Sequence, residues 1–283
     1  MKDSSLMVRF LYKSAVGRFL LKIIMKFHLD HLIVRFLCSP LSKPVIYLYV
    51  KYNNIPMTKD DLKLFDSFRD FFRRKKTALS FDNMPSHLIS PCDGWLSAFP
   101  IDEKSCFSIK NSHYCVSDFL QDTELAKNYL GGICLIFRLC VSDYHHYYYI
   151  DDGYQGENHF IPGVLHSVQP IAYETYPVFV LNKRSWCLLT TEHFGPVVQC
   201  EIGALVVGGI FNEKENSRFS KGMEKGHFEL AGSTIILLFE KEQMQLRPEL
   251  LYKLSLVEDI QVKYGEWIGT SERSKSYEAR YFS

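Results

Sequence analysis

The sequence predicts an α+β fold in which N-terminal amphipathic helices are followed by a mainly antiparallel β body. Apolar residues recur at helical spacing within residues 1–76, whereas short strand-like apolar runs dominate from residue 95 onward. Helices that precede the strands, rather than alternate with them, are typical of this fold class. The 283 residues are 47% hydrophobic and 23% charged, which allows a sizeable core and excludes disordered and collagen-like proteins.

Residues 1–52 form a basic, amphipathic segment. They contain nine Lys or Arg and two Asp, a net charge of +7, so the remainder of the chain carries −6. An apolar stripe and a neighbouring basic stripe share helical spacing, namely Phe19, Leu20, Ile23, Ile24 and Phe27 beside Arg18, Lys22 and Lys26. Such a helix is expected to lie in a membrane interface with its cations toward anionic headgroups. The alternative is a helix docked on the protein's own core.

This segment has neither the ~18 uncharged apolar residues of a membrane span nor the uninterrupted apolar part of a cleavable signal. We therefore assign residues 1–55 to a membrane-associating helical region and residues 56–283 to a second domain. Within that domain, residues 58–76 are predicted to be helical, and residues 117–129 to hold one or two short helices. Residues 82–94 and 212–227 are predicted to be loops because they are polar or rich in glycine and proline. The predicted strands are Leu96–Ile101, Ile133–Val141, Val178–Leu181, Trp186–Thr191, Val197–Ile202, Ala204–Phe211 and Thr234–Phe239.

Composition also limits the classes of ligand. None of the eight cysteines lies in a C-x-x-C pair and several lie in apolar runs, which predicts free thiols in a reducing cytosol. Clustered metal ligands are not evident in the sequence, so we predict no metal site. The net charge of +1 argues against a nucleic-acid partner.

The junction before the last predicted strand offers the clearest chemistry. Gly232-Ser233-Thr234 stands between a glycine-punctuated loop and the apolar strand, and Gly232 tolerates backbone angles that a Cβ would forbid. A serine hydroxyl that faces its own preceding carbonyl could attack it and convert the amide to an ester. The alternative is an ordinary turn before a strand, because the tripeptide alone is common.

Six segments, taken together, resemble the phosphatidylserine decarboxylase family. They are FDSFRDFFRR (65–74), SPCDG (90–94), DYHHYYYIDDG (143–153), LNKR (181–184), FGPVVQCEIGALVVGGI (194–210) and FSKGMEKGHFELAGSTIILLF (219–239). The resemblance implies a proenzyme that cleaves itself between Gly232 and Ser233. The products would be a β chain of residues 1–232 and an α chain of residues 233–283, with Ser233 converted to a pyruvoyl group. That group would form a Schiff base with the substrate amine and accept the electrons left by decarboxylation.

The resemblance also implies an Asp-His-Ser arrangement for the cleavage. Asp93 of Pro91-Cys92-Asp93-Gly94 matches the aspartate, and Ser233 matches the nucleophile. Better-known members read Y-H-x-x-H and use the second histidine as the base, a position that Tyr148 occupies here. Because a tyrosine is a poor base at neutral pH, we rank His145 first as the base, His166 second and His146 third. On the residues alone, Asp93 could be a turn former and His166 a core residue.

The resulting functional expectation is a pyruvoyl-dependent enzyme that converts phosphatidylserine to phosphatidylethanolamine and CO₂. The basic arm would hold it peripherally on the cytoplasmic face of the cell membrane, where its partners are the anionic lipid and the two chains of the same proenzyme, with a homodimer left open. Two alternatives remain: a decarboxylase of the same fold for a soluble, for example aromatic, amino acid, and a non-catalytic membrane-binding scaffold.

Overall fold

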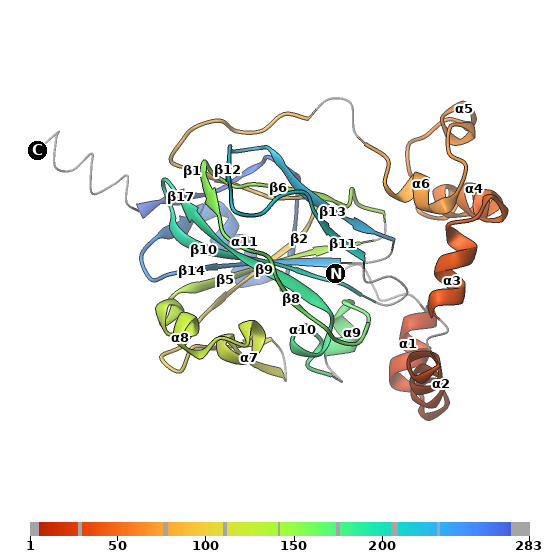
Figure 1. Ribbon diagram of the computed structural model, residues 1–283, viewed down its shortest axis with the longest axis horizontal. Coiled ribbons are helices and arrows are strands. Elements are labelled where there is room, and N and C mark those ends of the chain that lie inside the picture. Colours follow the sequence, from red (N-terminus) through yellow and green to blue (C-terminus); the bar gives the residue numbers. More distant parts are fainter. Residues whose placement is uncertain are drawn as a thin grey trace, which may run out of the picture.

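The structure is a computed structural model that describes residues 6–27, 30–75, 79–109, 112–140, 142–173, 176–204, 209–230 and 233–272. A helical arm lies at one end of a β body (Figure 1). The predicted α+β fold is confirmed, because the sheets are mainly antiparallel and the arm is helical.

The arm contains six helices and one 3-10 turn within the described residues. They are α1 (Leu6–Lys13), α2 (Ala15–Lys26), α3 (Asp30–Leu37), η1 (Pro40–Ser42), α4 (Lys43–Tyr52), α5 (Lys59–Lys63) and α6 (Phe68–Phe72). The single helix predicted over residues 58–76 is wrong: the segment forms two five-residue helices. The reason is local capping, since Thr58 caps α5 in a capping box and the Ser67 side chain accepts a hydrogen bond from Asp70 N to begin α6.

The arm packs on the body with one face and exposes another. Val8, Leu11 and Tyr12 of α1 are buried in the same core cluster as residues of the body. The predicted apolar stripe of α2 stays largely outside, with Phe19 66% exposed and Leu20 42% exposed. Among the described residues, no single helix is long and apolar enough to cross a bilayer; His31–Leu37 and Pro40–Tyr52, bent by 80°, pass that test only as a pair.

The body is built on one large antiparallel sheet with the strand order β12-β7-β9-β10-β14-β5-β2-β16, and β8 pairs with β9. The bounds are β2 (Gly94–Pro100), β5 (Ile133–Leu139), β7 (Gly153–Gln155), β8 (His159–Ile161), β9 (Arg184–Thr191), β10 (Gly195–Ile202), β12 (Ser217–Phe219), β14 (Ser233–Phe239) and β16 (Ile260–Val262). Strand β14 lies between β10 and β5 near the middle of the sheet. Its alternate residues enter different core clusters: Ile235 and Leu237 belong to one, Ile236 and Leu238 to the other. Burial on both faces explains the continuous apolar run of β14.

Smaller elements surround this sheet. Three small sheets are formed by β1 (His87–Ile89), β17 (Trp267–Ser271) and β15 (Met244–Leu246), by β11 (Gly209–Asn212), β13 (Glu224–Glu229) and β6 (His146–Tyr148), and by β3 (Cys106–Ile109) with β4 (Ser112–Cys115). The remaining helices are α7 (Val116–Leu120), α8 (Thr123–Ala126), η2 (Lys127–Tyr129), α9 (Pro170–Tyr173), α10 (Val178–Leu181) and α11 (Pro248–Leu256).

Several local predictions are wrong. The strand predicted at Val178–Leu181 is helix α10, which begins directly after Pro177 and is too short for apolar periodicity to identify. The loop predicted at 212–227 contains β12 and the start of β13, and the loop at 82–94 contains β1. The prediction of free thiols is wrong for two cysteines, since Cys106 and Cys115, which face each other in the β3–β4 hairpin, form a disulfide. The short helices predicted within residues 117–129 are present.

Candidate active site

Ser233 and His145 meet in the interior of the body. Ser233 begins β14 and is 1% exposed, and His145 immediately precedes β6 and is fully buried. The distance from His145 Nδ1 to Ser233 Oγ is 3.1 Å, which is within hydrogen-bonding reach. The histidine that we ranked first as the base therefore lies against the predicted nucleophile.

The environment of His145 leaves its Nδ1 free to accept a proton. Nε2 lies 3.0 Å from the carbonyl oxygen of Cys140, which can only accept a hydrogen bond, so Nε2 carries the hydrogen. The Ser233 hydroxyl is then the donor to the lone pair of Nδ1. Phe72 of α6 packs on the ring at 4.1 Å. Burial lowers the pKa of His145 to about 3, so the imidazole is neutral at pH 7.

Asp93 lies in the turn before β2 and is 4% exposed. Its Oδ1 accepts a hydrogen bond from Tyr264 N at 3.0 Å. The turn is also bonded to β6, because Tyr148 N donates to the Pro91 carbonyl at 2.9 Å. The Cys140 carbonyl, rather than Asp93, therefore lies on the far nitrogen of His145, where a catalytic triad places its aspartate.

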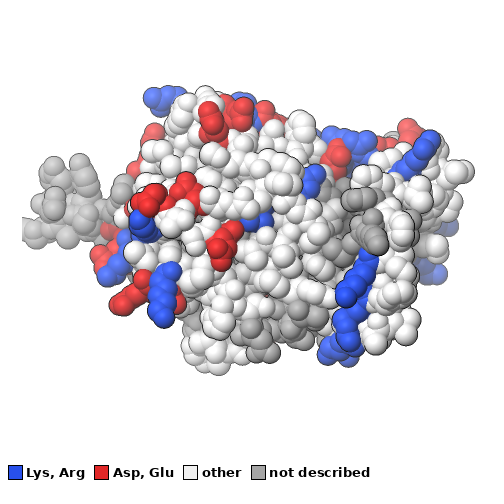
Figure 2. Space-filling view, turned by 60° about the horizontal axis from the view of Figure 1, so that its bottom comes forward, with Lys and Arg blue, Asp and Glu red and all other residues white. Residues whose placement is uncertain are grey.

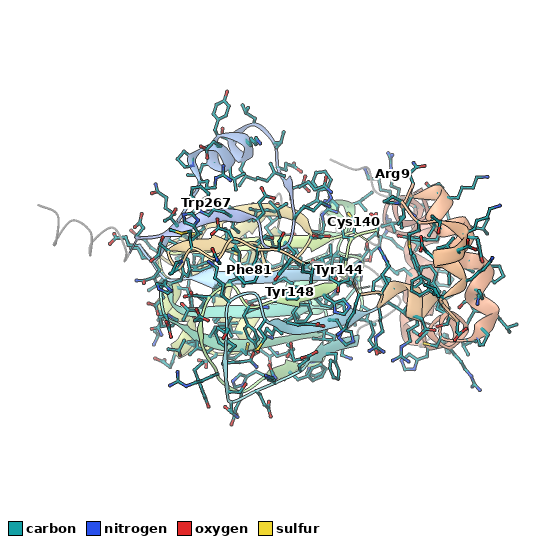
Figure 3. All side chains as sticks on the ribbon, turned by 90° about the horizontal axis from the view of Figure 1, so that it is seen from above. Arg9, Phe81, Cys140, Tyr144, Tyr148 and Trp267 are labelled. Atoms are coloured by element: carbon teal, nitrogen blue, oxygen red, sulfur yellow. A yellow bond between two sulfur atoms is a disulfide. The ribbon has the colours of Figure 1, made fainter. Side chains whose placement is uncertain are left out.

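Tyr148, at the position of the family's second histidine, belongs to an aromatic cluster. Its hydroxyl lies 3.5 Å from that of Tyr144, and its ring centroid lies 4.1 Å from that of Tyr264. Figure 3 shows Tyr144, Tyr148 and Cys140 together on the side of the body that is nearer the helical arm. Burial, with Tyr144 alongside, raises the pKa of Tyr148 far above its usual value. The phenol therefore stays neutral, in keeping with its exclusion as a base.

The two other candidate histidines have different partners. His166 Nδ1 lies 3.2 Å from the Tyr12 hydroxyl, and its ring stacks on Tyr176. His166 therefore joins α1 to the body, and burial lowers its pKa to about 4. His146 Nδ1 lies 2.6 Å from Glu224 Oε1, and its Nε2 lies 3.3 Å from the Arg73 carbonyl. Ser233 is not among these partners of His166 or His146.

Ion pairs from Arg69 of α6 and from Arg73, which follows this helix, hold the end of β13, and the sequence reasoning missed them. Arg69 Nη2 lies 2.5 Å and Arg73 Nη1 3.6 Å from Glu229 Oε1, at the end of β13. The next residue, Leu230, has φ +53°, a left-handed conformation that is costly for a branched side chain. Gly232, the predicted cleavage residue, lies outside the described residues. The motif FRDFFRR drew attention to Arg69 and Arg73 in the sequence, but nothing in the sequence indicated that Glu229 is their partner.

A buried hydroxyl beside Ser233 and a cluster of two histidines and a glutamate could each contact a cofactor or metal ion. Thr234 Oγ1 is buried next to Ser233 and has no hydrogen-bond partner among the described residues. His146, Glu224 and His227 offer ligand atoms that all lie within 4.8 Å of one another. Sequence reasoning missed this second cluster because its members lie on two strands that are far apart along the chain.

Comparisons with known proteins agree on one family. The family model for phosphatidylserine decarboxylase matches residues 64–270. A phosphatidylserine decarboxylase proenzyme 2 of Clostridium acetobutylicum is 40% identical over 93% of this chain and 91% of the relative. The phosphatidylserine decarboxylase proenzymes of Clostridium beijerinckii and Desulfitobacterium hafniense are 37% and 34% identical, over 93% and 95% of this chain and 92% and 93% of those relatives. The chain therefore belongs to the phosphatidylserine decarboxylase family and is a decarboxylase made as a proenzyme.

Proposed function

We propose that the protein cleaves itself between Gly232 and Ser233 and then converts phosphatidylserine to phosphatidylethanolamine and CO₂. The observation that carries this proposal is the contact between His145 Nδ1 and Ser233 Oγ at 3.1 Å. A serine hydroxyl is a weak nucleophile until an adjacent base removes its proton, and this pair supplies both groups.

The first chemical step is an exchange of an amide for an ester. Ser233 Oγ attacks the carbonyl carbon of Gly232 while His145 Nδ1 accepts the hydroxyl proton. The C–N bond breaks, and the amine of residue 233 takes up that proton. His145 carries a positive charge until it gives up this proton, and we assign Asp93 to stabilising that charge. Two observations support this role: Asp93 is buried, and a hydrogen bond ties the turn that contains it to β6.

The second step splits the chain. The Cα of residue 233 loses a proton and the bond between its Cβ and Oγ breaks, which leaves a double bond between Cα and Cβ. Gly232 keeps that oxygen and leaves as a carboxylate. One water then replaces the nitrogen of residue 233, with release of ammonia, which leaves a pyruvoyl group. The position suits a buried carbonyl, because the hydroxyl of the adjacent Thr234 has no hydrogen-bond partner among the described residues and can donate to it. When bound there, the group supplies the electron sink that decarboxylation requires.

The helical arm suits attachment to an anionic membrane. Phe10, Val16 and Phe19 expose about half or more of their surface on α1 and α2, and an apolar groove on α4 is lined by Val45, Leu48, Tyr49, Lys51 and Tyr52. Figure 2 shows Lys and Arg side chains along the arm, whereas Asp and Glu gather mainly on the body. Apolar side chains beside cations favour the interface of an anionic leaflet. We propose peripheral attachment on the cytoplasmic face, where phosphatidylserine would be at hand.

The intact mass of the purified protein, measured beside that of Ser233→Ala, tests the proposal. The wild type should give two chains, one that ends at Gly232 and one that begins with the pyruvoyl group. It should also release CO₂ from phosphatidylserine vesicles. Ser233→Ala should remain one chain of 33.0 kDa without activity. An uncut wild-type chain whose turnover survives borohydride would refute the self-cleavage. Release of CO₂ from free amino acids but not from vesicles would instead refute the lipid substrate.

A further inference from the structure

Three potential metal ligands gather next to the Ser233–His145 pair. His146 lies on β6, and Glu224 and His227 lie on the neighbouring strand β13. The two strands are joined close to the active site, since Phe228 N donates to the His145 carbonyl at 2.9 Å. The proposed cleavage uses none of the three side chains. We propose that His146, Glu224 and His227 form a binding site for a zinc-type divalent ion.

The geometry is close to what such an ion requires. His146 and His227 are direct partners across the strands, and their ring centroids lie 5.2 Å apart. The ligand atoms of the three residues lie within 4.8 Å of one another. In a tetrahedral site with metal–ligand bonds of about 2.0–2.1 Å, neighbouring ligand atoms are roughly 3.4 Å apart. Small rotations of the side chains would therefore bring the three atoms onto one ion.

His227 provides a separate indication that a ligand belongs here. Its side chain is buried, with 5% exposed, and neither Nδ1 nor Nε2 has a hydrogen-bond partner among the described residues. Buried polar groups are normally paired, so an imidazole with two unpartnered nitrogens calls for an explanation. One nitrogen of a neutral imidazole carries a lone pair that a metal ion can use. Its ring lies between those of His146 and Phe211, which restricts its orientation.

His146 and Glu224 complete the donor set. His146 Nε2 lies 3.3 Å from the Arg73 carbonyl, an outer contact of the kind that directs the other ring nitrogen toward a metal. That other nitrogen, Nδ1, shares a hydrogen with Glu224 Oε1 over 2.6 Å. The ion would replace this hydrogen, which would leave as a proton to the buffer, so binding should strengthen as pH rises.

The nearby cations leave room for an ion. Arg73 lies 3.6 Å from the Glu229 carboxylate, which offsets its charge. Lys75 contacts Glu224 Oε2 at 3.3 Å, but its side chain is 67% exposed and can turn into water. Two imidazoles and one carboxylate suit zinc better than magnesium or calcium, and they leave a fourth position for water. The ion would link β6 to β13 just before the cleavage segment.

Titration of the chelator-stripped, full-length protein tests this site. Zn²⁺ is added in competition with a chromophoric chelator, and Co²⁺ is used as a spectroscopic probe. We expect one equivalent to bind, the visible spectrum of four-coordinate Co²⁺, and no thiolate charge-transfer band. His227→Phe and Glu224→Gln should each weaken binding about 100-fold or more, because loss of even an outer partner costs 10–100-fold. The control is His159→Phe on β8 of the large sheet, where the ring stacks on Trp186; this variant should bind like the wild type.

Stability gives a second readout. Zn²⁺ should raise the thermal midpoint of the wild type and of His159→Phe, but not that of His227→Phe. The phenyl ring keeps the shape of the buried residue, and Glu224→Gln decides the matter if His227→Phe does not fold. Binding that survives in both variants, a thiolate band, or no binding beyond that of the chelator would overturn the proposal.

Discussion

At the scale of single residues, the site depends on which histidine faces Ser233. Ser233 and His145 were both identified from motifs, and the structure places them 3.1 Å apart. The group on the far side of His145 was not predictable, because it is the backbone carbonyl of Cys140 and any residue type provides a carbonyl. His227 was missed for a similar reason, since only strand register brings it to His146.

Replacing His145 by glutamine should slow self-cleavage by about 10²–10⁴-fold, the usual contribution of a general base. The readout is the rate at which the 33.0 kDa chain splits on a denaturing gel. His166→Gln is the matched control, because that ring is also buried but contacts Tyr12 and Tyr176. It should cleave within a few-fold of the wild type. Equal losses in both variants would contradict the assignment of His145.

At the scale of elements, helix α6 connects the arm to the strand that precedes the proposed cleavage site. It contributes Phe72 to the ring of His145, and Arg69 and Arg73 to Glu229. The strained residue Leu230 directly follows Glu229. Sequence periodicity indicated a helix here but not its length, because the capping side chains that divide α5 from α6 act locally.

Glu229→Gln should slow self-cleavage by less than tenfold, since the ion pair is partly exposed and such pairs contribute about 1 kcal/mol or less. The exchange Arg69→Glu with Glu229→Arg should restore part of the rate, because it rebuilds one ion pair with reversed charges. Rates of cleavage are compared in freshly synthesised chains. If the double variant cleaves more slowly than either single variant, the ion pair between Arg69 and Glu229 does not position the end of β13 for cleavage.

Helix α2 permits a sharper test of membrane attachment than deletion of the arm. Phe19→Asp should weaken binding to phosphatidylserine vesicles by roughly 10–100-fold, because burying a phenylalanine contributes ~1.5–3 kcal/mol. Leu256→Asp on α11 is the matched control, since the two side chains are 66% and 67% exposed. Co-sedimentation with vesicles measures both. Equal weakening by the two variants would remove the special role of α2.

At the scale of the whole molecule, the central strands were the most predictable part of the fold. Strands β5, β10 and β14 are buried on both faces. Most of their residues are apolar, although Arg138 lies in β5 and Gln199 and Glu201 lie in β10. The peripheral elements were not predictable to the same degree: α10 is a short apolar helix, and β12 and β13 are polar enough to resemble a loop. Their conformations depend on pairing with distant strands, such as β7 for β12 and β6 for β13.

Buried histidines should make the whole fold sensitive to acid. The pKa values of His145 and His166 fall to about 3 and about 4 from an ordinary 6.5, so the unfolded chain binds these protons first. The contribution of these neutral histidines to the free energy of unfolding is complete above pH 6.5. As pH decreases toward 4, the free energy of unfolding falls by about 1.4 kcal/mol per pH unit for each histidine. Urea unfolding of the uncut Ser233→Ala chain at pH 7, 6 and 5 measures the slope. A free energy of unfolding that is constant over this range would contradict it.

The location of β14 gives the maturation a direction. From Ser233 onward this strand is hydrogen-bonded along both edges, to β10 and to β5, and its side chains fill both cores. A break in front of Ser233 would thus leave a nicked molecule whose two pieces stay interlocked until denaturant separates them. Once separated, the short piece would have lost the covalent tether that brought it into the sheet. Maturation of this kind is a one-way event, and only the uncut precursor should regain the native state after unfolding.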